Sequence, residues 1–137
     1  MLRRRQVLAV LAATSAVGSV AAAPQDEAKA AMERWLALVD TKDYALSWQR
    51  AGSPFRSTVS QEQWAKASAS VRQSLGEPKQ RTLKSAQATN SLPGAPDGQY
   101  VVLQFDTSFT NKAAAVETVT AVLEPDGQWR AIGYFIK

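Results

Sequence analysis

The chain has 137 residues and a formal net charge of +4, and it contains neither cysteine nor histidine. The missing cysteines exclude disulfides, thiol nucleophiles and acylated lipoprotein cysteines. Because histidine is missing as well, the ordinary zinc, copper and haem sites and the histidine-based catalytic triads are excluded. We therefore predict no cofactor, no metal site and no catalytic residue set. The acid and base groups that remain are carboxylates, Tyr, Lys and Arg.

The first 22 residues have the layout of an export signal. Arg3, Arg4 and Arg5 precede an uncharged run over 7–23 that is rich in Ala, Val and Leu. A membrane-spanning helix would need about 20 strongly apolar residues, so a cleavable signal peptide is the better interpretation. We expect cleavage after Ala22 and a periplasmic or secreted protein with no membrane span. The general secretory route is expected, with the twin-arginine route as the alternative.

Removal of residues 1–22 changes the charge of the protein. That segment holds three of the 16 basic residues and none of the 12 acidic ones, so the remaining 13 basic and 12 acidic residues leave a net charge of +1. A large positive excess would indicate a nucleic-acid partner, and most of the excess is lost with the signal. Nucleic acid is therefore not a predicted partner, and residues 23–137 are expected to form a single domain.

Two helices are predicted at the start of this domain. Apolar residues recur at helical spacing over 26–40, with charged residues between them, which indicates an amphipathic helix. Asp43 is placed to cap a second, shorter helix. Gly52 and Pro54 are expected to end it, because both residues interrupt helices.

A third helix has the strongest signals, over 61–75. Ser60 and Gln63 have the spacing of a capping box, in which each side chain accepts a hydrogen bond from the other residue's backbone. Gly76 fits the left-handed position after a helix end, where glycine is favoured. The buried stripe of this helix is predicted to contain Trp64, Ala67, Val71 and Leu75.

Alternating apolar residues predict strands in the second half of the domain. The four expected ranges are 81–89, 99–109, 116–124 and 128–136. Candidate turns at 111–112 and 125–127 are short, and short turns connect antiparallel strands. The predicted fold class is therefore α+β, with N-terminal helices packed on a four-stranded antiparallel sheet.

The two turns predict which residues share a face of the sheet, with Asp106 opposite Glu117 and Glu124 opposite Gln128. The face expected under the helices carries Val101, Leu103, Phe105, Val116, Thr118, Thr120, Val122, Ile132, Tyr134 and Ile136. The other face would carry Tyr100, Val102, Gln104, Asp106, Glu117, Val119, Ala121, Leu123, Trp129 and Phe135. This second face is apolar enough to be completed by another copy of the chain. The predicted homodimer interface is Tyr100, Leu123, Trp129 and Phe135.

Several stretches of the chain resemble a known family. They are 35–40, Tyr44, Ser47-Trp48, Gln63-Trp64, 72–76, the run PGAPDGQY over 93–100, 105–112, 117–120, 126–129 and 133–135. On these stretches the chain resembles the exported bacterial proteins of domain-of-unknown-function family 4019. The element order resembles the nuclear transport factor two-like, or cystatin-like, cone, in which a curved sheet closes over helices. This likeness implies a short first strand that is lost or irregular, around 55–59, and it implies no established activity.

The candidate site residues have structural as well as functional interpretations. Arg72 lies near a helix end, where it could bind an anion or satisfy helix carbonyls. Trp48 sits on a short helix beside a loop and is expected to edge a pocket, whereas Trp35 and Trp64 are expected to pack in the core. Asp106 and Glu117 could form a carboxylate pair, or they could be outward charges that meet basic residues or water.

Three functions remain open on the sequence. The leading one is a non-enzymatic periplasmic module that binds an apolar or weakly anionic small ligand, or an envelope protein, at the mouth of the cone. The predicted ligand residues are Trp48, Trp64, Arg72 and Tyr134. The second is a dimeric structural or interaction module that uses the outer sheet face. The third is an isomerase-like or hydrolase-like enzyme with a carboxylate and a tyrosine. Its nominated residues are Asp40, Asp43, Tyr44 and Tyr134, and one of its carboxyl groups would need a raised pKa.

Overall fold

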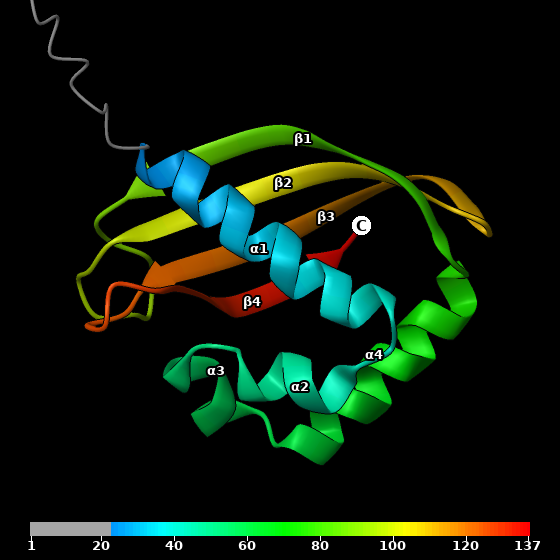
Figure 1. Ribbon diagram of the computed structural model, residues 1–137, viewed down its shortest axis with the longest axis horizontal. Coiled ribbons are helices and arrows are strands. Elements are labelled where there is room, and N and C mark those ends of the chain that lie inside the picture. The colour runs from blue at the N-terminus through cyan, green and yellow to red at the C-terminus, as the bar shows by residue number, and fades with distance from the viewer. Residues whose placement is uncertain (1–22) are drawn as a thin grey trace, which may run out of the picture.

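The computed structural model describes residues 23–137, and the predicted signal peptide lies outside them. Four helices come first, followed by four strands (Figure 1). The helices are α1 Pro24–Asp40, α2 Tyr44–Gln49, α3 Ser53–Thr58 and α4 Gln61–Leu75, and the strands are β1 Pro78–Thr89, β2 Tyr100–Phe109, β3 Lys112–Leu123 and β4 Trp129–Ile136. No helix in this part of the chain has the length and apolarity needed to cross a membrane.

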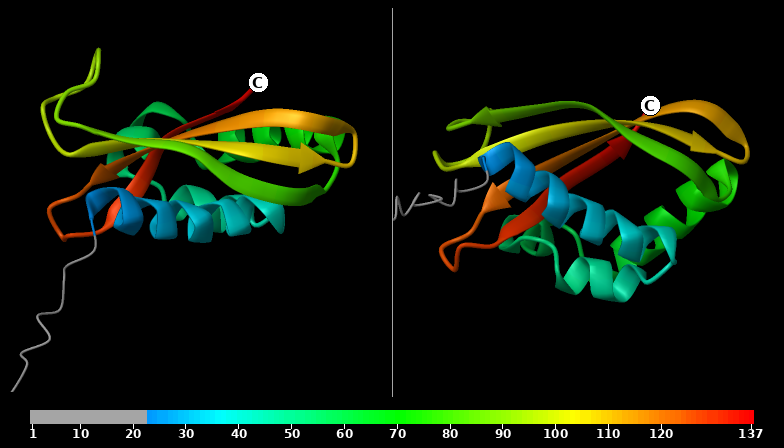
Figure 2. Two further views of the ribbon diagram at one scale, coloured as in Figure 1. Left: turned by 90° about the horizontal axis from the view of Figure 1, so that it is seen from above. Right: turned by 45° about the horizontal axis from the view of Figure 1, so that its top comes forward.

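The strands form one antiparallel sheet in the order β1-β2-β3-β4. Helix α1 crosses one face of the sheet, and α2, α3 and α4 lie beyond β4 (Figures 1 and 2). The predicted α+β class, with helices packed on a curved four-stranded sheet, is confirmed. The sheet curves around the helices but remains open, so β1 and β4 are its two edges.

Helix α1 forms the central layer of the core because its apolar residues follow the helical period. Its buried side chains are Ala28, Met32, Trp35, Leu36 and Val39. They belong to one cluster with the inward residues of the sheet, which are Val101, Leu103, Phe105, Val119, Ala121, Trp129 and Ala131. The hydrophobic effect therefore holds α1 against the sheet.

Two tryptophans join α1, α2 and α4. The rings of Trp35 and Trp64 lie 5.7 Å apart between centroids. The Nε1 of Trp35 donates to the backbone oxygen of Ser47 at 2.8 Å, and the Nε1 of Trp64 donates to the Ser47 hydroxyl at 2.8 Å. Both rings are buried, as predicted. The buried polar atoms of this junction are thus paired with one another, which orients α4 relative to α1.

The predicted start and end of α4 are confirmed. The capping box is formed in both directions, from the backbone of Gln63 to Ser60 at 3.1 Å and from the backbone of Ser60 to Gln63 at 3.0 Å. Gly76 follows the helix with a φ of 80°. A Cβ there would lie 1.7 Å from the hydroxyl oxygen of Thr110. Only glycine therefore allows the chain to pass from α4 into β1 at this point.

The predicted register between β2 and β3 is wrong by one residue. Phe105, and not Asp106, pairs with Glu117, because the turn lies one position earlier and a bulge occurs between Thr107 and Phe109. A one-residue shift moves every side chain of a strand to the opposite face. Glu117, Val119 and Ala121 therefore face the helices, and the predicted carboxylate pair does not form.

The predicted turn at 125–127 is confirmed, since Glu124 and Gln128 are paired through the backbone. The side chains of β3 point to the face opposite to the predicted one. Its partner strand follows this change, so Trp129 lies in the core and Leu123 packs against the core cluster. A second irregularity, opposite Thr120 and Ala121, restores Tyr134 to the inner side.

These changes remove most of the predicted dimer face. Tyr100 and Trp129 are buried within the chain, Leu123 is partly buried, and Phe135 is exposed. The placement of all four residues on one open face is therefore wrong. Dimerisation itself stays a prediction.

Two further expectations about the helical half are wrong. The segment around 55–59 is not a lost or irregular strand, because Ser53–Thr58 forms helix α3, with Pro54 in its first turn, where a missing N–H carries no cost. Asp43 does occupy the position before α2, but its side chain makes no capping hydrogen bond.

Candidate functional site

A cluster of buried charged groups fills the inner face of the sheet at the end of α1. We call Asp40, Arg72, Arg81 and Glu117 the ion cluster; they come from α1, α4, β1 and β3. Arg81 donates to both oxygens of Asp40, at 2.8 and 2.9 Å, and its Nε donates to Glu117 at 2.7 Å. Arg72 donates to Asp40 at 2.8 Å. Two cations and two anions therefore neutralise each other.

Neutral groups complete the hydrogen bonds of Glu117, which is fully buried. Its carboxylate accepts from the Thr107 hydroxyl at 2.5 Å and from the Tyr134 hydroxyl. Arg72 donates to the same tyrosine at 3.0 Å. A buried carboxylate needs this many partners because removing an ion from water costs on the order of several kcal/mol of free energy, which the partners must offset.

The pKa of Asp40 moves in the opposite direction to the raised carboxyl pKa expected for the enzyme. Burial alone would raise the pKa of Asp40, but the hydrogen bonds and charges of Arg81 and Arg72 outweigh it and lower that pKa. Burial, with the charge of Glu117, raises the pKa of Tyr134 well above its ordinary value. Asp40 therefore stays ionised and Tyr134 stays protonated near neutral pH, and its lowered pKa makes Asp40 a weaker proton acceptor than a carboxylate with the raised pKa expected for the enzyme.

An apolar groove lies next to the ion cluster, between α4 and β4. It has a volume of about 310 Å³ and is lined by Val39, Trp64, Ala67, Ser68, Val71, Arg72, Tyr134, Phe135 and Ile136. We call it the α4–β4 groove. Sites for small molecules have volumes of roughly 300–1,000 Å³, so it lies at the small end of that range.

The α4–β4 groove holds the two large apolar side chains that are exposed in the described part of the chain. Val71 is 48% exposed and Phe135 is 57% exposed. The prediction that Val71 and Ala67 belong to the buried stripe of α4 is therefore wrong, because both are exposed. Isolated exposed apolar residues are common, but Val71 and Phe135 lie together in one groove. Ser68 also lines this groove, and its buried hydroxyl has no hydrogen-bond partner among the described residues.

Three of the four predicted ligand residues line this groove, namely Trp64, Arg72 and Tyr134. Trp48 does not, because its Nε1 donates to the backbone oxygen of Val59 at 2.7 Å and its ring packs against the core. Arg72 does not satisfy helix carbonyls, since its two Nη atoms donate to Asp40 and Tyr134. Its buried Nε has no hydrogen-bond partner among the described residues.

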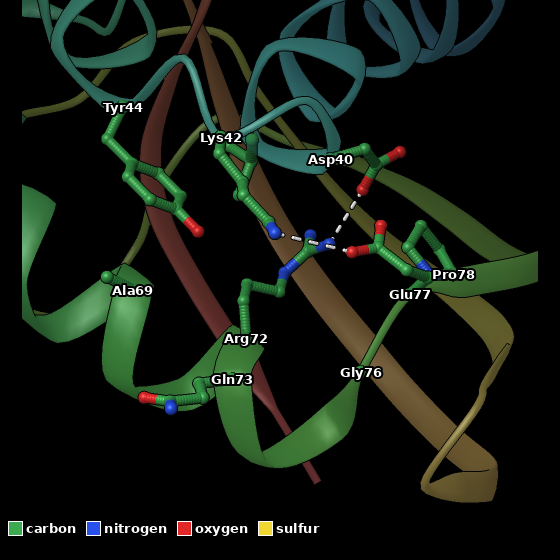
Figure 3. Close-up of a pocket in the computed structure, with 10 residues that line it drawn as sticks. Asp40, Lys42, Tyr44, Ala69, Arg72, Gln73, Gly76, Glu77 and Pro78 are labelled. Atoms are coloured by element: carbon green, nitrogen blue, oxygen red, sulfur yellow. Dashed lines mark hydrogen bonds and ion pairs between the residues drawn. The ribbon is translucent and has the colours of Figure 1, made fainter.

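A second hollow lies on the other side of Arg72, at the junction of α1, α4 and β1. This Lys42 pocket has a volume of about 420 Å³, and Lys42, Tyr44, Arg72 and Glu77 point toward its centre (Figure 3). Lys42 contacts Glu77 at 3.5 Å, and Arg72 contacts Asp40 at 2.8 Å. Each cation of this pocket thus has an anion within 3.5 Å.

A third hollow lies between α1, the end of α2 and the start of β4. We call it the arginine pocket; its volume is about 380 Å³, and its lining is Ala31, Met32, Arg34, Trp35, Leu38, Gln49, Arg50, Gln128, Trp129 and Arg130. No acidic residue lines it. The three arginines come from separate elements, a combination that no sequence motif marked.

The sequence interpretation missed Arg81, Thr107 and the buried role of Glu117. Arg81 and Thr107 stand in strands where a polar residue at an inward position is the only signal, and that signal depends on the correct register. Asp40 was nominated, but as part of an enzyme or as a helix end. Its partner Arg72 is separated from it by 32 positions.

Comparison with solved structures supports the fold. The structure of Aln2 from a Streptomyces species matches with a TM-score of 0.51 at 13% sequence identity, covering 85% of this chain and 92% of that one. This is a likeness of fold alone, and it supports the cone-like arrangement of helices and a curved sheet expected from the element order. Comparison with curated protein sequences finds no match.

The family comparison covers most of the chain. The family model described as "Protein of unknown function (DUF4019)" matches residues 31–134, from α1 to β4. The match includes the whole ion cluster and the lining of all three hollows, apart from Phe135 and Ile136 of the α4–β4 groove. The chain therefore belongs to the family of proteins of unknown function DUF4019, as the resemblance of its sequence predicted.

Proposed function

We propose that the protein is a non-enzymatic binding module whose α4–β4 groove takes a small, uncharged and mostly apolar ligand. The observation that carries this proposal is that Val71 and Phe135, the large apolar side chains exposed in the described chain, both line that groove. An apolar ligand would cover them and gain the corresponding hydrophobic stabilisation. Trp64 and Tyr134 add aromatic contact area at the base.

The state of Arg72 favours an uncharged ligand over an anionic one. Its guanidinium lies 2.8 Å from Asp40 and 3.0 Å from the hydroxyl of Tyr134, and it is 6% exposed. An anion in the groove would have to compete with Asp40 for this cation and would lose its own hydration. Of the apolar and weakly anionic ligands considered from the sequence, the apolar class therefore fits this groove better.

A matched pair of fluorophores tests the proposal. N-phenyl-1-naphthylamine is uncharged, and 1-anilinonaphthalene-8-sulfonate has the same rings with an added sulfonate. The Ala67→Trp variant fills the groove from an exposed helix position, and Ala30→Trp makes the same change on the exposed face of α1 as a control. We expect Ala67→Trp to weaken binding of the uncharged probe about tenfold, equivalent to about 1.4 kcal/mol.

The control sets the meaning of the result. Ala30→Trp should bind the uncharged probe like the unaltered protein, and the sulfonate should not improve groove binding. Equal binding to all three proteins would show that the probe does not use the groove and would contradict the proposal. Tighter binding of the sulfonate than of the uncharged probe, lost in Ala67→Trp, would also contradict the proposal.

We also propose that the protein works outside the cytoplasm. The support is the order of three arginines, an apolar run and a small-residue end in the first 22 residues. The intact mass of the protein isolated from its host should correspond to a chain that begins at Ala23. A mass that includes residues 1–22 would contradict this proposal.

The homodimer stays an alternative, and the position of Trp129 decides which variant can test it. Trp129 is in the core, so Trp129→Glu would unfold the protein whether or not it dimerises. Phe135 is exposed, and Phe135→Glu can be made without this cost. Sedimentation equilibrium of Phe135→Glu against the unaltered protein would detect a dimer through this residue.

A further inference from the structure

The arginine pocket contains two cations that lack anionic partners. Arg34 on α1 and Arg50 after α2 line the pocket and make no ion pair with any residue of 23–137. The first 22 residues contain no Asp or Glu that could neutralise them. The third arginine differs, because Arg130 is paired with Asp126 at 2.7 Å. The pocket thus carries about two uncompensated positive charges.

A buried donor in the same pocket also has no partner. Trp129 lines the pocket and is 8% exposed, and its Nε1 makes no hydrogen bond with the described residues. The contrast with the other core tryptophans is clear, since Trp35 and Trp64 each donate to Ser47 at 2.8 Å. Buried indole N–H groups usually have an acceptor, and one that has none needs an explanation.

The remaining lining defines the kind of ligand. Gln49 and Gln128 add amide groups, and Met32, Trp35 and Leu38 supply apolar surface. No carboxylate lines the pocket to repel an anion. The Lys42 pocket is the opposite case, because Glu77 and Asp40 neutralise its cations.

We propose that the arginine pocket binds a small organic dianion, of the class of a phosphate monoester with a compact apolar substituent. Arg34 and Arg50 contact its oxygens, because guanidinium groups match phosphate oxygens in charge and geometry. The indole N–H of Trp129 donates to the same group or to its ester oxygen. The apolar substituent lies against Met32 and Leu38. This site is separate from the α4–β4 groove and does not depend on the function proposed for that groove.

Three probes with one ring separate charge from shape. Phenyl phosphate is a dianion at pH 8, phenyl sulfate is a monoanion, and phenol is neutral. We expect phenyl phosphate to bind at least about tenfold more tightly than phenyl sulfate, and phenol not to bind measurably. Because the second phosphate pKa is about 6, binding of phenyl phosphate should weaken below that pH, whereas binding of phenyl sulfate should not change.

Variants locate the site. Arg34→Gln and Arg50→Gln should each weaken phenyl phosphate binding at least about tenfold, while Arg56→Gln on α3, an exposed arginine outside the pocket, should leave it unchanged. All three arginines are exposed, so these variants should fold, and circular dichroism checks that they do. The indole ¹H–¹⁵N resonance of Trp129 should shift on addition of phenyl phosphate.

Each other outcome overturns the proposal. Absence of phenyl phosphate binding excludes the site. Equal affinity for the phosphate and the sulfate excludes a dianion site. If Arg56→Gln loses as much affinity as Arg34→Gln, or if the Trp129 resonance does not move, the probe is held by surface charge and not by the arginine pocket.

Discussion

The Lys42 pocket and the arginine pocket are both hollows lined by cationic side chains, and they differ in whether those cations have ion-pair partners. Around the Lys42 pocket every cation has an anion nearby, Lys42 with Glu77 and Arg72 with Asp40. Around the arginine pocket Arg34 and Arg50 have none within the described chain, and only Arg130 is paired. Charges that stabilise a fold are matched within it, whereas unmatched ones remain available to a ligand.

The largest effect should come from breaking the ion cluster, which contributes Asp40 and Arg72 to the Lys42 pocket. Glu117→Ala removes a fully buried carboxylate and leaves Arg81 without one of its two anions. We expect the free energy of unfolding to fall by about 3–5 kcal/mol, because an uncompensated buried charge remains. Urea denaturation followed by tryptophan fluorescence measures this change.

The arginine pocket provides the control for that measurement. Arg34→Gln and Arg50→Gln change exposed residues that have no ion pair in the described chain, so they should alter the free energy of unfolding by about 0.5 kcal/mol or less. A loss of several kcal/mol in either variant would mean that these arginines support the fold and would remove the contrast between the two pockets.

A smaller effect should distinguish the tryptophans. Trp64→Phe removes a hydrogen bond to Ser47, whereas Trp129→Phe removes an N–H that has no partner in the described structure. Both changes shrink a buried ring, so the difference between them reports mainly on the hydrogen bond. Trp64→Phe should cost about 1–2 kcal/mol more than Trp129→Phe in thermal or urea unfolding. Equal costs would indicate that Trp129 has a partner.

The smallest expected effect is a dependence of stability on acid. The arginine contacts lower the pKa of Asp40 in the folded protein below its ordinary value near 3.8. The stability that this shift contributes is present above that value and is lost as the pH falls through the lower, folded pKa. Asp40→Asn should be less stable at pH 7 but should lose less stability between pH 6 and pH 3. An unchanged acid slope, measured by urea unfolding at each pH, would contradict this assignment.

Local signals in the sequence predicted most of the fold. The capping box at Ser60 and Gln63 and the glycine at 76 set the limits of α4, because those features depend on residues close together in the chain. The family and the α+β class were predicted as well. Helix α3 was missed because Pro54 was interpreted as the end of one helix, although proline also begins helices.

The sites were harder to predict because they depend on register and on distant contacts. One bulge between Thr107 and Phe109 moved Glu117 into the core and changed an apparent carboxylate pair into a neutral ion cluster. No local pattern encodes such a bulge. The groove residues Trp64, Arg72 and Tyr134 were nominated together as ligand residues. Val71 was predicted to be buried, and Phe135 was nominated only for the dimer interface, although both are exposed and line the groove.

Native mass spectrometry of the protein purified from its host tests the binding proposal for the α4–β4 groove most directly. The account predicts a monomer that carries an uncharged small molecule, with the adduct lost in Ala67→Trp and retained in Ala30→Trp. An adduct of equal abundance in both variants, or a dimer without any small molecule, would contradict it.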